Sequence, residues 1–200
     1  AIRWLDYVVR GIDNEINKEP PITFFLMGSN EWRREQEWPL SRTIFTKYYF
    51  HSDGFRHGTL NTDSPNNEPS NKYLYDPSDP VHTLGGNHSG PQDHPEVIRV
   101  GAINQRPNWE RQDVLVFETP TLVEDVEVIG PVTVTLFASS STVDTDFVAR
   151  LIDIQPNGIA YNLTEGILRA RFKESIYQAP KLLEPGKVYE YEIDLQPTAN

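Results

Sequence analysis

The sequence has no cysteine, no long apolar run and no basic cluster larger than the pair Arg33-Arg34. Without cysteine there are no disulfides, no thiolate nucleophile and no cysteine-ligated zinc, although this does not fix the compartment. No apolar stretch approaches the roughly 20 residues that span a bilayer. The net charge of -11 argues against a nucleic-acid partner. We therefore expect a protein that binds neither membrane nor nucleic acid. Composition leaves the compartment open; we expect the cytoplasm, with secretion as an alternative.

Catalytic signatures are missing as well. The chain has no G-x-S-x-G string, which would place a serine nucleophile on a strand-to-helix turn. Its five histidines lie in or beside predicted loops and lack the spacing of a zinc-binding helix. Asp144 and Asp146 are candidate calcium ligands, but aspartates at a strand entrance more commonly bond their own turn. We predict no catalytic residue, no metal ligand and no cofactor within these residues.

The first 30 residues have an α/β pattern. Apolar residues recur at helical spacing over residues 2–12, and Gly11 is placed to end the helix in a left-handed conformation. Residues 22–28 are apolar at both alternating sets of positions, as in a strand buried on both faces of an α/β sheet. The chain opens directly in the helical pattern and lacks an initiator methionine, so we expect an excerpt that begins with a helix-strand remnant.

Beyond residue 30 the pattern changes to alternation with period two, which predicts strands. Two loops, residues 52–72 and 76–95, are rich in Asn, Ser, Pro, Asp and Gly. The turn Gln155-Pro156-Asn157-Gly158 predicts a hairpin with a primed turn. The spacing suits a mainly β protein, a β-sandwich, with strands over residues 44–51, 73–75, 113–118, 123–129, 132–139, 147–154, 159–163, 166–175 and 188–195.

An ordered set of short motifs resembles the family of cocaine esterase, α-amino-acid ester hydrolase and X-prolyl dipeptidyl peptidase. The likeness covers all 200 residues, and the order of the motifs makes it specific. They include Arg3-Trp4-Leu5-Asp6, Tyr73-Leu74-Tyr75-Asp76-Pro77, Leu84-Gly85-Gly86, Gln105-Arg106-Pro107, Asp144-Thr145-Asp146-Phe147 and Glu165-Gly166-Ile167-Leu168-Arg169.

The resemblance implies a serine hydrolase whose Ser-His-Asp triad cleaves acyl ester or amide bonds and lies outside this chain, with the histidine just upstream of Ala1. Residues 1–30 would end the α/β-hydrolase domain. Residues 31–200 would form a jelly-roll β-sandwich, galactose-binding-like and incomplete at its C-terminus. In this family the loop after Leu-Gly-Gly covers the acyl pocket, which implies a substrate-binding role for Asn87 and His88.

Two alternatives stay open. One is a non-catalytic carbohydrate-binding β-sandwich, which the 11% aromatic residues would suit. The other is a structural lid that holds the catalytic domain of the same parent and supports a homodimer. The expected partners of the leading hypothesis are that catalytic domain and a small ester or amide substrate.

Overall fold

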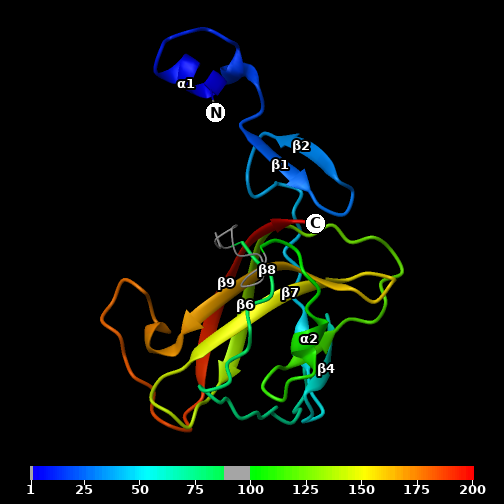
Figure 1. Ribbon diagram of the computed structural model, residues 1–200, viewed down its shortest axis with the longest axis vertical. Coiled ribbons are helices and arrows are strands. Elements are labelled where there is room, and N and C mark those ends of the chain that lie inside the picture. The colour runs from blue at the N-terminus through cyan, green and yellow to red at the C-terminus, as the bar shows by residue number, and fades with distance from the viewer. Residues whose placement is uncertain (1, 88–99) are drawn as a thin grey trace. The chain divides into compact units, whose positions relative to one another are not determined.

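The computed structural model describes residues 2–87 and 100–200 of the chain (Figure 1). They divide into two compact units, the first comprising Ala1–Ile44, Glu127–Gly130 and Ala199–Asn200, and the second comprising Phe45–Val126 and Pro131–Thr198. Strands dominate the described residues, so the predicted mainly β fold class is confirmed.

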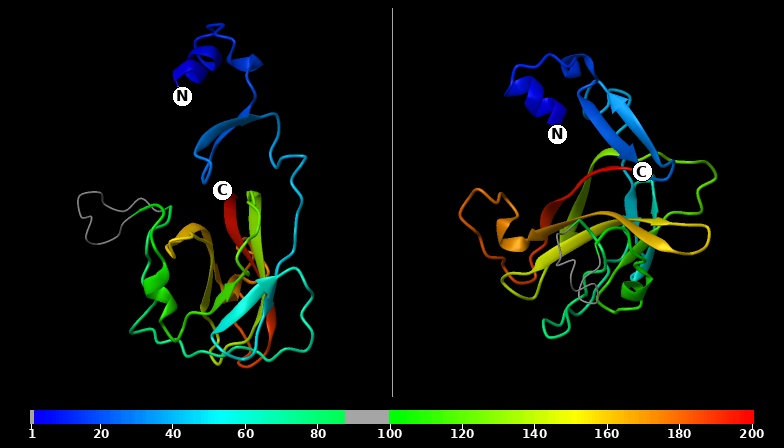
Figure 2. Two further views of the ribbon diagram at one scale, coloured as in Figure 1. Left: turned by 90° about the vertical axis from the view of Figure 1, so that its right-hand side faces the viewer. Right: turned by 45° about the horizontal axis from the view of Figure 1, so that its top comes forward.

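The first unit holds a short helix and a hairpin. Helix α1 (Ile2–Val8) is followed by Gly11 at φ +67°, so the predicted helix and its glycine stop are confirmed. After the 3-10 turn η1 (Ile16–Lys18), β1 (Ile22–Leu26) pairs antiparallel with β2 (Glu31–Glu35), as the right-hand view of Figure 2 shows in blue. The strand prediction is correct, whereas burial of both faces in an α/β sheet stays a prediction. Phe25 is 38% exposed because a two-stranded hairpin leaves one face uncovered.

The second unit is built around four long strands. β6 (Ile129–Ala138) pairs with β9 (Tyr189–Ala199), while β7 (Asp146–Ile154) pairs antiparallel with β8 (Ala160–Arg169). The 3-10 turn η2 (Ala170–Phe172) follows β8. Residues 159–163 and 166–175 were predicted as separate strands, whereas β8 is continuous from Ala160 to Arg169. A register shift that leaves Leu163 unpaired lies where the alternation breaks.

A smaller sheet lies in the same unit. β4 (His57–Asn61) pairs antiparallel with β3 (Tyr49–His51) and parallel with β5 (Val116–Glu118), and the short helix α2 (Arg106–Trp109) precedes β5. The predicted strands at 44–51 and 113–118 are therefore much shorter than expected. Residues 73–75 and 123–128 form no strand, and their apolar residues Leu74 and Val123 are 86% and 98% exposed. In these two segments the alternating sequence pattern did not lead to a strand, because no neighbouring strand pairs with them.

The hairpin between β7 and β8 is confirmed, but its turn type is not. The Gly158 N–H donates to the Gln155 carbonyl at 2.8 Å, and Gly158 alone among the turn residues has positive φ, at +82°. Pro156 explains the difference, because its ring holds φ near about -65° and a primed turn needs positive φ at that position. The turn therefore belongs to the unprimed class and is followed by a glycine in the left-handed conformation, as is common in three-residue hairpin loops.

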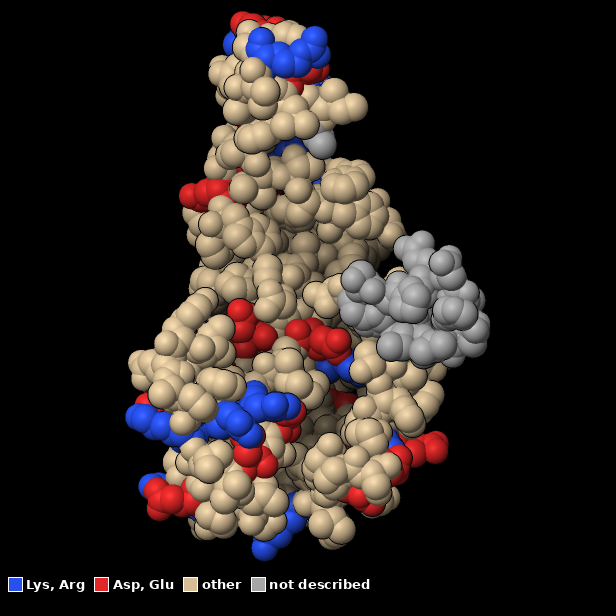
Figure 3. All heavy atoms as spheres, turned by 60° about the vertical axis from the view of Figure 1, so that its left-hand side comes forward, with Lys and Arg blue, Asp and Glu red and all other residues tan. Residues whose placement is uncertain are grey.

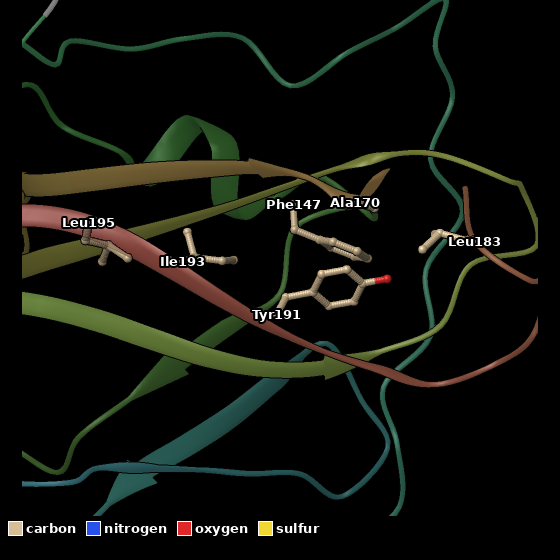
Figure 4. Packing of buried hydrophobic residues seen from close by; sticks show 6 residues of the cluster. All are labelled: Phe147, Ala170, Leu183, Tyr191, Ile193 and Leu195. Carbon is tan, nitrogen blue, oxygen red and sulfur yellow. The ribbon is translucent and has the colours of Figure 1, made fainter. Parts of the chain in front are cut away.

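The core lies between the two long strand pairs. Buried side chains of β7, β9 and the flanking segments form one cluster, drawn in Figure 4: Phe147, Ala170, Leu183, Tyr191, Ile193 and Leu195. Side chains of β6 and β8, such as Val134 and Leu168, pack against it, as expected of a β-sandwich. In the sequence, Tyr189, Tyr191, Ile193 and Leu195 alternate with the charged residues Glu190, Glu192 and Asp194, which favours a strand with one apolar face. The structure buries Tyr191, Ile193 and Leu195 on that face and pairs the strand with β6.

Tyr191 carries a polar atom into this core. Its side chain is fully buried, its ring lies 4.7 Å from that of Phe147, and its hydroxyl, which points toward Leu183 in Figure 4, has no hydrogen-bond partner among the described residues. Burial raises the pKa of this hydroxyl. The group is therefore desolvated without compensation.

We expect Tyr191→Phe to leave the thermal unfolding midpoint unchanged or to raise it, because the lost hydroxyl contributes no hydrogen bond. The gain in free energy of unfolding should be at most about 1 kcal/mol. Differential scanning calorimetry checks this, with Tyr177→Phe at a 93% exposed position as the control. A loss of more than about 1 kcal/mol would show that the hydroxyl does have a partner.

Candidate functional site

The candidate site is the pair Gly86 and Gly101, which flank residues 87–100 in the sequence. Gly86 and Gly101 form an antiparallel bridge in which each N–H donates to the other's carbonyl, at 2.9 and 2.8 Å. Gly85, Gly86 and Gly101 all have positive φ, at +71°, +109° and +89°. This conformation favours glycine, because a Cβ crowds the neighbouring carbonyl there. The bridge brings together residues 15 apart and defines the two ends of the intervening segment.

Buried polar side chains lie directly beneath this bridge. Gln105 is 1% exposed and its Nε2 donates to the carbonyls of Leu84 and Ile103, at 2.7 and 2.9 Å. Asn162 of β8, 7% exposed, accepts the Ile103 N–H at 2.8 Å and donates to the Gly101 carbonyl at 3.3 Å. The residues on both sides of the segment are thus bonded to buried side chains of the second unit, Gln105 directly before α2 and Asn162 on β8.

Of the two predicted substrate-binding residues, the structure describes one. Asn87 follows the bridge directly and is exposed, so its side chain is accessible to a ligand. His88 falls in residues 88–99, outside the described residues. The substrate role of both residues stays a prediction.

Sequence reasoning missed Gln105 and Asn162 as site residues. Gln105 was noted only as part of a motif, and Asn162 only as a residue of a predicted strand. A usable signal was present for Asn162, because a polar residue at the same inward-facing parity as Ala160 must find buried partners. For Gln105 no local pattern distinguishes it from a surface residue.

A second hollow has a superficial likeness to a catalytic centre. It has a volume of about 410 Å³ and is lined by His51, Ser52, Asp53, His57, Gly58, Thr59 and Glu68. His51 Nδ1 lies 2.6 Å from Glu68 Oε1, and this pairing raises the pKa of His51 and lowers that of Glu68. However, His51 Nε2 lies 3.0 Å from the Asp63 carbonyl, which can only accept.

Because both ring nitrogens face acceptors, the surroundings of His51 favour its protonated form. In that form the ring has no lone pair with which to take a proton from Ser52, whose Oγ accepts the Gly54 N–H at 2.9 Å. The arrangement is an ion-paired clamp between the end of β3 and the segment that follows β4, and it lacks the geometry of a nucleophile and its base.

We predict that Glu68→Gln lowers the His51 pKa, which an NMR titration of the imidazole measures. Because the folded pKa of His51 is raised, the pair stabilises the fold fully below the unfolded value of about 6.5, and this contribution is lost as pH rises through the folded pKa. Because the folded pKa of Glu68 is lowered, the contribution of this carboxylate to stability is lost as pH falls through its folded pKa.

The difference in thermal midpoint between the unmodified protein and Glu68→Gln should therefore be largest between about pH 4.5 and 6.5. A difference that stayed constant from pH 4.5 to 9 would contradict the ion pair.

The aspartates considered for calcium have arginine partners. Arg171 donates to Asp144 through its backbone N–H at 3.0 Å and its Nε at 2.6 Å, and Arg169 donates to Asp146 through Nε and Nη2 at 2.8 and 2.9 Å. Burial opposes ionisation of Asp144, but the bonds from Arg171 outweigh it and leave its pKa below the ordinary value. The expected bonds to the aspartates' own turn are replaced by bonds across the β7–β8 hairpin.

Charges on the rest of the surface are also interspersed. On the face shown in Figure 3, acidic and basic side chains lie next to each other. Ion pairs such as Lys181–Glu174 and Lys187–Glu184 belong to this pattern. Within residues 2–87 and 100–200, no three His, Asp or Glu side chains are grouped so that they could hold a metal ion, and no helix has the length and apolar composition to cross a bilayer.

Comparison with known proteins relates this architecture to a family. Residues 14–200 match the family described as the X-Pro dipeptidyl-peptidase C-terminal non-catalytic domain. The chain belongs to this family.

This chain has relatives that are named as esterases. It is 40% identical over 205 residues to the protein named "Cocaine esterase" of Rhodococcus sp. (strain MB1 Bresler), which covers 98% of this chain and 34% of that protein. It is 29% identical over 218 residues to the protein named "Putative serine esterase Mb1866c" of Mycobacterium bovis, covering 99% and 33%. The chain spans about a third of the length of the curated relatives that it matches. The family suggested by the sequence motifs is confirmed.

Proposed function

We propose that these residues are the C-terminal part of a serine hydrolase that cleaves acyl ester or amide bonds, and that its Ser-His-Asp triad lies outside residues 1–200. The observation that carries the proposal is the 40% identity to a cocaine esterase over 98% of the chain. Support also comes from the clamp of His51 and Glu68 beside Ser52, in which both ring nitrogens of His51 face acceptors and neither is directed at the serine.

In this proposal the second unit is scaffold and one wall of the acyl pocket. The Gly86–Gly101 bridge presents the segment between them, and Asn87 and His88 at its start contact the acyl group of a small substrate. The parent's α/β-hydrolase domain is the intramolecular partner, a homodimer stays an alternative for light scattering to test, and the cytoplasm is the proposed compartment.

The division into an α/β-hydrolase end at residues 1–30 and a jelly roll at residues 31–200 belongs to the same proposal. The boundary has to accommodate the β1–β2 hairpin, whose strands pair across residue 30, and a family match that begins at residue 14.

Turnover of chromogenic acyl esters by the full-length protein tests the proposal. We expect hydrolysis that a serine-directed acylating reagent abolishes. Calorimetry against oligosaccharides, with and without calcium, tests the carbohydrate-binding alternative, whose suggested calcium ligands are bonded to Arg169 and Arg171. Sugar binding without ester or amide turnover would replace the proposal with that alternative.

A further inference from the structure

The turn between β7 and β8 contains the one Asn-Gly pair of the sequence, Asn157-Gly158. Both residues are exposed, at the tip of the hairpin (Figure 1). A Cβ on Gly158 would have no heavy atom of residues 2–87 or 100–200 within 4 Å. A side chain on the residue after an asparagine hinders the approach of that residue's peptide nitrogen to the asparagine amide. At Gly158 this hindrance is absent, and the turn is accessible to water.

The hydrogen bond of the Asn157 side chain favours a reaction between these two groups. Asn157 Oδ1 accepts the Ile159 N–H at 3.0 Å, and this bond closes a ring that contains the Gly158 nitrogen. The side-chain carbonyl is therefore held beside that nitrogen. The Ile159 N–H also donates to the oxygen on which negative charge develops when a nucleophile adds to the carbonyl, so it stabilises that charge.

The main-chain hydrogen bond of the turn opposes the same reaction. The Gly158 N–H donates to the Gln155 carbonyl at 2.8 Å, and the nitrogen can attack only after this bond has opened. A turn at the tip of a hairpin can open locally while the strands stay paired. Because the net contribution of one such bond is modest, its opening should slow the reaction about tenfold rather than prevent it.

We propose that Asn157 is a site of spontaneous deamidation in the folded protein. The Gly158 nitrogen bonds to Asn157 Cγ, the Cγ–Nδ2 bond breaks, and Nδ2 leaves as ammonia with the proton of the Gly158 N–H. Water then opens the resulting succinimide at one of its two carbonyls. One product is aspartate, and the other is isoaspartate, whose main chain is longer by one methylene. No group is oxidised or reduced, and the inference does not depend on the proposed function.

The isoaspartate product disrupts the contact between the turn and α2. The Gly158 carbonyl accepts the Arg106 Nε at 3.0 Å, and the guanidinium carbon of Arg106 lies 4.3 Å from the ring centroid of Trp109. The extra methylene before Gly158 displaces its carbonyl, so the bond from Arg106 is lost. The modification therefore loosens α2 from the hairpin.

Peptide mapping by mass spectrometry of the full-length protein, incubated in mildly alkaline buffer with and without urea, tests the inference. Without urea we expect aspartate and isoaspartate to accumulate faster at Asn157 than at Asn67, which is also exposed but precedes Glu68. In urea the conversion at Asn157 should be about tenfold faster, because the bond to the Gln155 carbonyl is absent. Incubation should also accelerate hydrogen exchange of the α2 amides. Asn157→Gln should abolish both effects, because glutamine would have to form a larger ring.

Conversion at Asn157 that is no faster than at Asn67 in the folded protein would overturn the inference, and so would conversion that occurs only in urea. Equal rates at Asn157 with and without urea would overturn the restraining role of the bond between Gly158 and Gln155. Accelerated exchange of the α2 amides in incubated Asn157→Gln would overturn the effect assigned to the isoaspartate.

Discussion

Gly166→Ala is expected to destabilise the sandwich by about 3 kcal/mol, because overpacking against a rigid neighbour cannot be relieved by side-chain rotation. A Cβ on this residue of β8 would lie 2.7 Å from the Asp194 carbonyl carbon and 3.1 Å from the Leu195 Cα of β9. These are backbone atoms in a strand that also pairs with β6. The two strand pairs therefore approach each other closely at a position where β8 has no side chain.

Thermal unfolding of the protein and hydrogen exchange of β8 and β9 measure this effect. Ile167→Ala is the matched control, because it shortens the adjacent side chain of β8 at a position that is 66% exposed, and it should change stability by less than about 1 kcal/mol. Similar losses in the two variants would show that β8 and β9 do not approach as closely as described.

Gly85→Ala is expected to open the Gly86–Gly101 bridge. Gly85 has φ +71°, and a Cβ there would meet the Gly101 carbonyl and lie 3.1 Å from both Asn162 Oδ1 and the Ile103 side chain. Left-handed strain of about 1–2 kcal/mol adds to this steric conflict. With a total near 3 kcal/mol, amide exchange at Gly86 and Gly101 should accelerate about 100-fold, while β9 keeps its protection.

Gly101→Ala separates the two causes. It has φ +89° but no heavy atom of residues 2–87 or 100–200 within 4 Å of a Cβ, so backbone strain should dominate and the acceleration should be about tenfold. Equal acceleration in the two variants would contradict the close packing of Gly85 against Gly101 and Asn162.

Local alternation was sufficient to predict the strands that form the core. Tyr191, Ile193 and Leu195 share one parity in the sequence and share the buried face in the structure. Alternation failed at residues 73–75 and 123–128, because a strand also needs a neighbour and the identity of neighbours is not a local property. The turn at Pro156 shows the opposite case, in which one residue's chemistry determines the local geometry.

The candidate site was less predictable than the fold. The motif Leu84-Gly85-Gly86 located it, but its support comes from Gln105 and Asn162, which are 57 residues apart and whose roles exist only once β8 lies beside the end of the segment. In the same way, the sequence could identify Asp144 and Asp146 as carboxylates at a strand entrance, but not that Arg171 and Arg169 of the opposite side of the hairpin would bond them. The alternating pattern of the sequence carries no information on which side chains pair at long sequence separation.

The central claim is that this chain supports a serine hydrolase without supplying its nucleophile. The most direct test treats the full-length protein with a fluorophosphonate reagent, digests it and identifies the modified serine by mass spectrometry. We predict that one serine is modified, that it lies outside residues 1–200, and that its modification abolishes ester hydrolysis. Modification of Ser52 or of another serine within residues 1–200, with loss of activity, would contradict the account.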